Sequence, residues 1–291
     1  LPARLAFVND LVPREDLINA VGLNSLLFNS ARAVGPALAG VMFLLANLVL
    51  PEFPPGTNPV TLGAVACFSV NALSFLAVLI ALWGIHVPGD SAKRKQPATS
   101  TWEGIRYLRE NATLGGLVLL TLVMCIFGWP LLTILPAFTR LRLGQSEQTY
   151  SLLVSMVGAG ALLASLTTAT FGTTERRWRF LVIGAAVTAV GLLNVSLAES
   201  VAYAAAACAT AGFGLILFLS TGQSTLQLAV PDEKRGRVMA LWAMTLAASA
   251  PLGHLLAGQA VIVLGVETVL AGMASGVGVC ALALTVLLAK R

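Results

Sequence analysis

A polar face on an otherwise apolar helix is the first feature of the sequence that could carry chemistry. Ser25, Asn29, Arg32 and Pro36 follow one another at intervals of three or four residues, so they share one side of a helix. Arg32 lies inside an apolar segment, where a cationic side chain costs of order 2.5–3.5 kcal/mol or more in lipid. Two interpretations remain open. Arg32 lines a water-filled cavity and attracts an anionic or carbonyl-rich substrate, or it pairs with carbonyl groups or an acid and fixes the packing.

A histidine in another apolar segment is the second candidate. His254 could gain and lose a proton near pH 6–7 and so act as a proton relay. A packed, hydrogen-bonded histidine is the commoner arrangement, and the sequence alone does not separate the two.

Aromatic and amide side chains complete the set of candidates. Trp129 precedes Pro130 and Thr133, and Gln223 follows a cluster of hydroxyl residues. Such groups could hold an amphipathic ligand by stacking and hydrogen bonding, or they could anchor and pack their helices. We therefore take five residues as candidates for substrate binding or gating: Asn29, Arg32, Trp129, Gln223 and His254.

The residue patterns of enzymes and metal sites do not occur. The sequence has no G-x-S-x-G or H-E-x-x-H motif, and its 13 acidic residues fall in loops or at the ends of apolar segments. Cys67, Cys125, Cys208 and Cys280 form no C-x-x-C pair, so they indicate neither a zinc site nor a disulfide framework. We predict no enzymatic activity, no metal and no cofactor, and any carboxylate that exchanges protons is expected upstream.

The segments that position the candidates have the composition of membrane-spanning helices. Hydrophobic residues make up 57% of the 291 residues and charged residues 11%, compared with about 45–50% and about 25% in soluble domains. The continuous apolar blocks exclude a transmembrane barrel, whose strands alternate apolar and polar residues. At about 20 residues per crossing, the sequence predicts an all-α membrane protein with eight spans, near Val21–Leu50, Val60–Val87, Leu114–Phe138, Ser151–Phe171, Phe180–Leu197, Val201–Gln223, Val238–Leu264 and Thr268–Leu288.

Basic residues divide unevenly between alternate loops. One side holds only Arg140 and Arg142, and the other holds fifteen, namely Arg4, Arg14, Lys93, Arg94, Lys95, Arg106, Arg109, Arg176, Arg177, Arg179, Lys234, Arg235, Arg237, Lys290 and Arg291. The positive-inside rule then places both termini in the cytoplasm. The net charge of +5 is explained by this topology, and no nucleic-acid partner is expected.

Two parts of the sequence resemble each other. Residues 12–40 align without a gap on residues 230–258, with matches that include Val12–Val230, Pro13–Pro231, Gly35–Gly253 and Gly40–Gly258. Chance similarity between apolar segments is the alternative, but the loop matches favour duplication. Both copies run in the same direction across the membrane, as in transporters with two parallel halves. Five spans separate them, so a six-span repeat and twelve helices are expected. The start at Leu1-Pro2-Ala3-Arg4 suggests the middle of a longer protein.

The residues at these positions resemble the major facilitator superfamily, in particular its bacterial branch of transmembrane secretion effectors, which includes enterobactin-exporter-like and macrolide-efflux-like proteins. The resemblance is carried by Asp10–Ala20, Leu23–Ser25, Phe28–Arg32 and Gly35–Gly40, and it extends over essentially the whole chain. The first span also resembles the superfamily's antiporter motif, with alanine at two glycine positions: Gly22, Ala31, Gly35, Pro36, Ala39 and Gly40.

The resemblance implies a fold and a function. The visible spans would be helices 5–12 of twelve, with residues 1–87 ending the N-terminal six-helix bundle, 88–113 forming a cytoplasmic central loop and 114–291 forming the C-terminal bundle. The protein would be a monomeric secondary transporter in the bacterial inner membrane. It would export a small organic molecule, siderophore or drug-like, by alternating access with proton antiport. A truncated, transport-inactive fragment or an interaction module is the alternative.

Overall fold

The computed structural model describes residues 38, 41–42, 45–46, 59–84, 101–145, 147–171 and 177–289. Its internal contacts divide the chain into two compact units, residues 1–99 and 100–291, which are described separately. In the first unit, Leu38, Val41, Met42, Leu45 and Ala46 are helical, and helix α3 spans Pro59–Trp83. The remainder of the first expected span, Val21–Leu50, lies outside the described residues.

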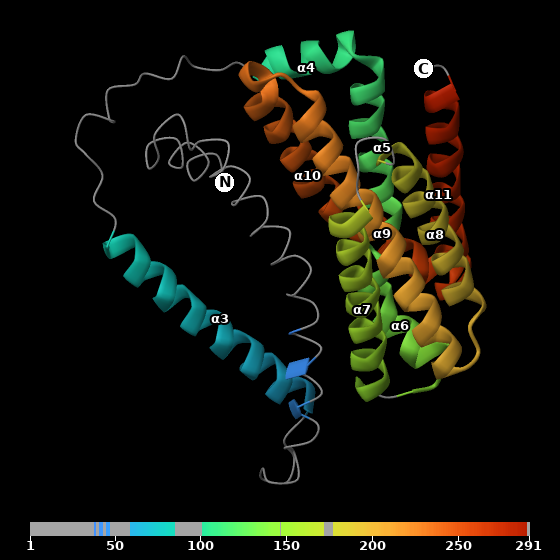
Figure 1. The fold of residues 1–291 in the computed structure, drawn as a ribbon. Helices are drawn as coiled ribbons and strands as arrows, with labels where there is room; N and C mark the ends of the chain where they lie inside the picture. Colours follow the sequence, from blue (N-terminus) through green and yellow to red (C-terminus); the bar gives the residue numbers. More distant parts are fainter. Residues whose placement is uncertain are drawn as a thin grey trace. The chain divides into compact units, whose positions relative to one another are not determined.

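The second unit is a helical bundle with one short helix across its end (Figure 1). The helices pack side by side, and the most extensive contacts join α9 to α7 and α8. Its elements are α4 (Thr101–Glu110), α5 (Ala112–Gly128), α6 (Leu131–Leu141), α7 (Glu147–Phe171), α8 (Arg177–Leu197), α9 (Val201–Ala229), α10 (Asp232–Leu264) and α11 (Val266–Ala289).

Within the described residues, seven helical stretches are long and apolar enough to cross a membrane: Thr61–Trp83, Ala112–Leu141, Thr149–Thr168, Arg177–Leu197, Val201–Ala229, Glu233–Leu264 and Val266–Leu287. They correspond to the expected spans from the second to the eighth. The prediction of an all-α membrane protein is confirmed, and the described elements are all helices.

Small residues set the spacing of α7, α8 and α9. A Cβ atom on Gly184 of α8 would lie 2.7 Å from the backbone nitrogen of Phe218 and 2.9 Å from the carbonyl oxygen of Gly214. On the other side of α9, a Cβ on Gly212 would meet the backbone of Val157. Because backbone atoms cannot move aside as a side chain can, these helices approach this closely only where the side chain is absent.

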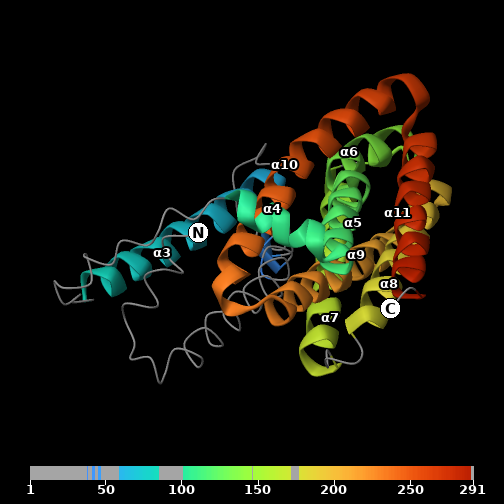
Figure 2. The same ribbon diagram turned by 90° about the horizontal axis from the view of Figure 1, so that it is seen from above.

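The structure adds a helix within the expected central loop. α4 lies within residues 88–113 and belongs to the second unit, where it lies across the end of the bundle between α5 and α10 (Figure 2). Leu108 is buried, whereas Trp102 and Arg106 are exposed. A search for continuous apolar runs does not detect such an amphipathic helix, because only one of its faces is apolar.

The third expected span, Leu114–Phe138, consists of two helices. α5 ends at Gly128 and α6 begins at Leu131, with Trp129 and Pro130 between them. Pro130 has no N–H group to donate to the carbonyl of Ile126, and its ring crowds that carbonyl, so the helix is interrupted here.

Ion pairs lie at the two ends of the bundle, which we call the α4 end and the Arg142 end. At the α4 end, Arg237 of α10 pairs with Glu103 of α4. At the Arg142 end, the guanidinium of Arg142 lies 3.2 Å from a carboxylate oxygen of Glu199 and 3.0 Å from one of Glu267. Arg142 therefore links the end of α6 to the α8–α9 loop and to the start of α11.

Candidate functional site

Helix α10 crosses the interruption between α5 and α6 at very short range. A Cβ atom on Gly253 would lie 2.7 Å from the carbonyl oxygen of Ile126 and 3.1 Å from Cγ of Pro130. This carbonyl is the acceptor that Pro130 cannot serve in the helix. The crossing thus places a glycine of α10 directly against a carbonyl group of α5 that Pro130 leaves without its usual helical donor.

A side-chain hydrogen bond joins the two helices beside this crossing. The hydroxyl oxygen of Thr133 on α6 lies 2.7 Å from Nδ1 of His254 on α10. His254 is half-buried and Thr133 is exposed on the surface of the second unit. Both groups can either donate or accept, so which of them donates depends on the tautomer of the imidazole.

Prolines flank this contact on both helices. Pro136 lies inside α6 and Pro251 lies inside α10, one turn before His254. Each proline removes a backbone hydrogen bond and weakens its helix locally. We call Pro130, Thr133, Pro136, Pro251 and His254 the proline junction.

The proline junction lies near the middle of a membrane span. Trp129 follows the 17 residues of α5, about 26 Å from the start of that helix at 1.5 Å per residue. The complete span, Ala112–Leu141, has 30 residues. Trp129 is half-buried and packs against the core beside the junction.

Gln223 is not part of this group. It is half-buried on α9, six residues before the helix ends at Ala229, which places it about 9 Å from the α4 end of that helix. The structure therefore brings Trp129 and His254 to the same region and leaves Gln223 at a different depth in the bundle.

The hydroxyl cluster that precedes Gln223 is buried between α7 and α9. The hydroxyl of Ser220 lies 3.1 Å from that of Thr168 on α7, and Phe218, Ser220 and Thr221 are buried. Most of these hydroxyls also bond to carbonyls one turn back in their own helix, as Ser220 does to Ile216 at 2.7 Å. This cluster therefore contributes to helix packing within the second unit.

The remaining candidates lie outside the described residues. They are Asn29 and Arg32, together with the residues of the antiporter-like motif, Gly22, Ala31, Gly35, Pro36, Ala39 and Gly40. Their roles stay predictions from the sequence.

Among the described residues, no group of three or more His, Cys, Asp and Glu side chains could hold a metal ion. The described acidic side chains lie at helix ends or in connections, as Glu103, Glu199 and Glu267 do. In this part of the chain, His254 is the titratable group that the proline junction offers.

Sequence comparison decides the family. The profile of the transmembrane secretion effector family, a branch of the major facilitator superfamily, matches residues 1–290. The chain belongs to this family. It is a multi-pass membrane protein of a transporter superfamily, as the seven apolar helices of the described part also indicate. A search of curated proteins found no match.

Sequence reasoning named Trp129, Pro130, Thr133 and His254, but it did not pair them. The contact depends on the crossing of α10 with α6, and residues 121 positions apart in the chain give no local pattern for it. The glycine at 253, which aligns with Gly35, and the proline at 130 are the sequence signals that could have indicated a close crossing.

Proposed function

We propose that this transmembrane secretion effector exports a small organic molecule, siderophore or drug-like, across the bacterial inner membrane in exchange for protons. The family membership supports export. The observation that carries the mechanism is the hydrogen bond between Thr133 and His254, which joins two proline-interrupted helices.

The proline junction supplies what alternating access requires. Two halves rock about a fixed site in transporters of this kind, so some helices must change direction without unfolding. Prolines within α6 and α10 provide such points, because the backbone there already lacks a hydrogen bond. The bond between Thr133 and His254 then couples the two movable segments.

Protonation of His254 changes what this bond can do. A neutral imidazole with an unprotonated Nδ1 accepts a hydrogen bond from Thr133, whereas an imidazolium donates one instead. For the tautomer with an unprotonated Nδ1, proton binding thus reverses the donor and acceptor roles at the contact. On the proposed mechanism, this reversal links the protonation state to the arrangement of α6 and α10.

The charges at the two ends of the bundle support one orientation in the membrane. The described basic residues at the α4 end are Arg106, Arg109, Arg177, Arg179, Lys234, Arg235 and Arg237, whereas Arg140 and Arg142 lie at the other end. Arg142 forms ion pairs with Glu199 and Glu267, so its position at this end is explained by a structural role. The distribution supports a cytoplasmic α4 end and cytoplasmic termini. That the protein acts as a monomer is part of the proposal and does not depend on these charges.

Everted membrane vesicles test this proposal. Cells lacking their main efflux pumps would express the complete coding sequence, and vesicles from them would be assayed for uptake of a labelled macrolide and of a catecholate siderophore. We expect uptake of one class when a proton gradient is imposed, and loss of uptake when an ionophore collapses the gradient. Uptake that persists unchanged without a gradient would contradict proton antiport, and no uptake of any tested small organic compound would contradict export.

A pair of tryptophan variants tests whether the junction binds the substrate. Trp129→Phe keeps much of the packing but loses the indole N–H and part of the stacking surface, so we expect KM to rise several-fold. Trp102→Phe is the matched control, because Trp102 lies on α4 and is 75% exposed. The same KM for both variants would contradict a substrate site at the junction.

A further inference from the structure

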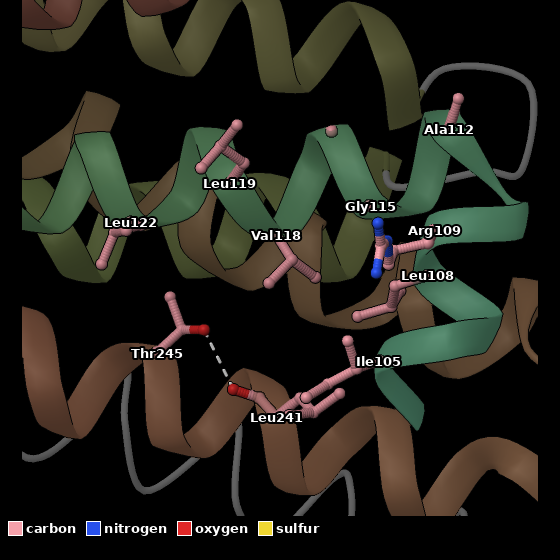
Figure 3. Close-up of a pocket in the computed structure, with 11 residues that line it drawn as sticks. Ile105, Leu108, Arg109, Ala112, Gly115, Val118, Leu119, Leu122, Leu241 and Thr245 are labelled. Atoms are coloured by element: carbon pink, nitrogen blue, oxygen red, sulfur yellow. Dashed lines mark hydrogen bonds between the residues drawn. The ribbon is translucent and has the colours of Figure 1, made fainter. Parts of the chain in front are cut away.

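A groove lies between α4, α5 and α10 at the α4 end of the bundle, away from the proline junction. It has a volume of about 480 Å³, which is within the range of small-molecule sites. In Figure 3, α5 and α10 form its two walls, and α4 closes one end. Its lining residues are Ile105, Leu108, Arg109, Ala112, Gly115, Gly116, Val118, Leu119, Leu122, Leu241 and Thr245.

The lining is apolar except at one end. Thr245 is polar, but its hydroxyl donates to the carbonyl oxygen of Leu241 in its own helix at 2.9 Å (Figure 3). Arg109 is the charged side chain in the lining. The groove therefore offers one cationic group and, below it, a surface of aliphatic side chains and glycine.

Arg109 differs from the basic residues around it. Arg106 pairs with Glu110 at 2.9 Å, Arg237 pairs with Glu103, and Nζ of Lys234 lies 4.7 Å from the centre of the Tyr107 ring. Arg109 is exposed and forms no ion pair within the described residues. An unneutralised guanidinium at the head of an apolar groove suits an anion that carries a hydrocarbon chain.

The depth of the groove agrees with this chemistry. It begins where amphipathic α4 meets α5, at the level where an interfacial helix lies. From Ala112 to Leu122 it follows α5 for about 15 Å into the membrane span. A charged group at Arg109 would therefore lie among lipid headgroups, and a chain below it would lie in the hydrocarbon region.

We propose that this groove binds an anionic phospholipid, with its phosphate on Arg109 and an acyl chain between α5 and α10. The lipid would come from the leaflet on the α4 side of the membrane. It would hold α4 against the bundle in addition to the Glu103–Arg237 pair. The proposal does not depend on the transported substrate, because the groove and the proline junction share no residue.

Native mass spectrometry of the complete protein in detergent tests the charge. Phosphatidylglycerol and zwitterionic phosphatidylethanolamine would be titrated separately. We expect tighter binding of phosphatidylglycerol, and Arg109→Gln should weaken it about fivefold, as expected for one basic group near an anionic headgroup. Arg106→Gln removes the same charge from the same helix, and it should change the affinity by less than twofold because Arg106 is already paired with Glu110.

A second pair of variants tests the apolar part. Leu119 is 61% exposed and lines the groove, so Leu119→Trp can obstruct it without disturbing the core. Leu282 of α11 is 68% exposed and is not among the lining residues, which makes Leu282→Trp the control. We expect Leu119→Trp to lose phosphatidylglycerol binding and Leu282→Trp to keep it. Equal binding of the two lipids by the wild type, equal losses in the two arginine variants, or full binding by Leu119→Trp would overturn the proposal.

Discussion

The contact between Thr133 and His254 makes a quantitative prediction about how stability and transport separate. The two atoms lie 2.7 Å apart, and hydrogen bonds between membrane helices contribute about 0.6 kcal/mol on average and at most about 1.7 kcal/mol. Thr133→Val removes the hydroxyl but keeps the shape of the side chain. We expect it to lower the free energy of unfolding by an amount within this range.

His254→Asn separates the hydrogen bond from the proton. The asparagine amide can take the place of Nδ1 and keep a bond to Thr133, but it does not titrate between pH 5 and pH 8. We therefore expect the free energy of unfolding of His254→Asn to lie no more than about 0.5 kcal/mol below that of Thr133→Val, because His254→Asn retains a hydrogen bond to Thr133. Proton-driven export should fall at least about tenfold, because the asparagine does not bind a proton in this pH range. The small change in stability would not explain a loss of this size.

The assay combines denaturant unfolding in detergent with transport in proteoliposomes between pH 5.5 and 8. The double variant completes the cycle and gives the coupling energy of the pair. Thr285→Val is the control, because its hydroxyl bonds only to Leu282 of its own helix, at 2.7 Å. Wild-type export by His254→Asn at every pH would refute the proton role of His254. A coupling energy of zero in both the unfolding and the transport measurements would refute the contact between Thr133 and His254.

Three other substitutions test the packing, the ion pairs and the first span. Gly184→Ala should destabilise the bundle by about 1–3 kcal/mol, because α8 must move about 0.7 Å from α9 to restore ordinary contact. Gly278→Ala is the control and should be neutral or stabilising, because a Cβ at Gly278 would meet nothing within 4 Å. Equal melting temperatures for the two variants would contradict this prediction. Arg142→Gln loses two partly exposed ion pairs and should lower the free energy of unfolding by about 1 kcal/mol at low salt. This difference from the wild type should shrink in 1 M salt, and thermal unfolding at both salt concentrations would measure it. Arg32→Gln should weaken export of an anionic or carbonyl-rich compound while leaving expression and melting temperature near wild type, so loss of folded protein would assign Arg32 a structural role.

Hydropathy was sufficient to predict the seven spanning helices of the described residues, because the cost of an unsatisfied backbone group in lipid leaves few alternatives to a helix. It could not predict α4, whose stability depends on contacts with α10 such as Glu103–Arg237. The interruption at Pro130 is visible in the sequence as a proline. Its position beside Gly253 depends on how α10 crosses α5, which no local pattern contains.

The candidate site was predictable as residue types and not as a geometry. Trp129 and His254 were identified because polar and aromatic groups are conspicuous in an apolar segment. Gln223 was identified by the same reasoning, but it lies at another depth, because composition does not report the level of a residue in the bundle. The groove at Arg109 could not be predicted from the sequence. Its walls are ordinary apolar residues that become a site only when three helices meet.

The predicted repeat offers a reason why a histidine can occupy this position of α10. Position 253 requires glycine, because a Cβ there would lie 2.7 Å from the carbonyl oxygen of Ile126. The residue aligned with it in the predicted repeat, Gly35, is also a glycine. The proline that follows Gly35 has its counterpart in His254, while α10 carries its own proline at 251. Because the proline of α10 lies one turn before the position aligned with Pro36, position 254 can carry a side chain that reaches Thr133.

The proposed proton antiport places a further condition on His254. Coupling between two ligands is reciprocal, so a substrate that expels the proton must itself bind less well when His254 is charged. The part of the substrate that meets His254 should then be a hydrogen-bond donor or a cation, because an anion would hold the imidazolium in place. Thr133 provides the alternative acceptor for the protonated ring. On the proposed mechanism, the hydroxyl of Thr133 bonds to His254 in both protonation states, and the substrate competes with it for the neutral ring.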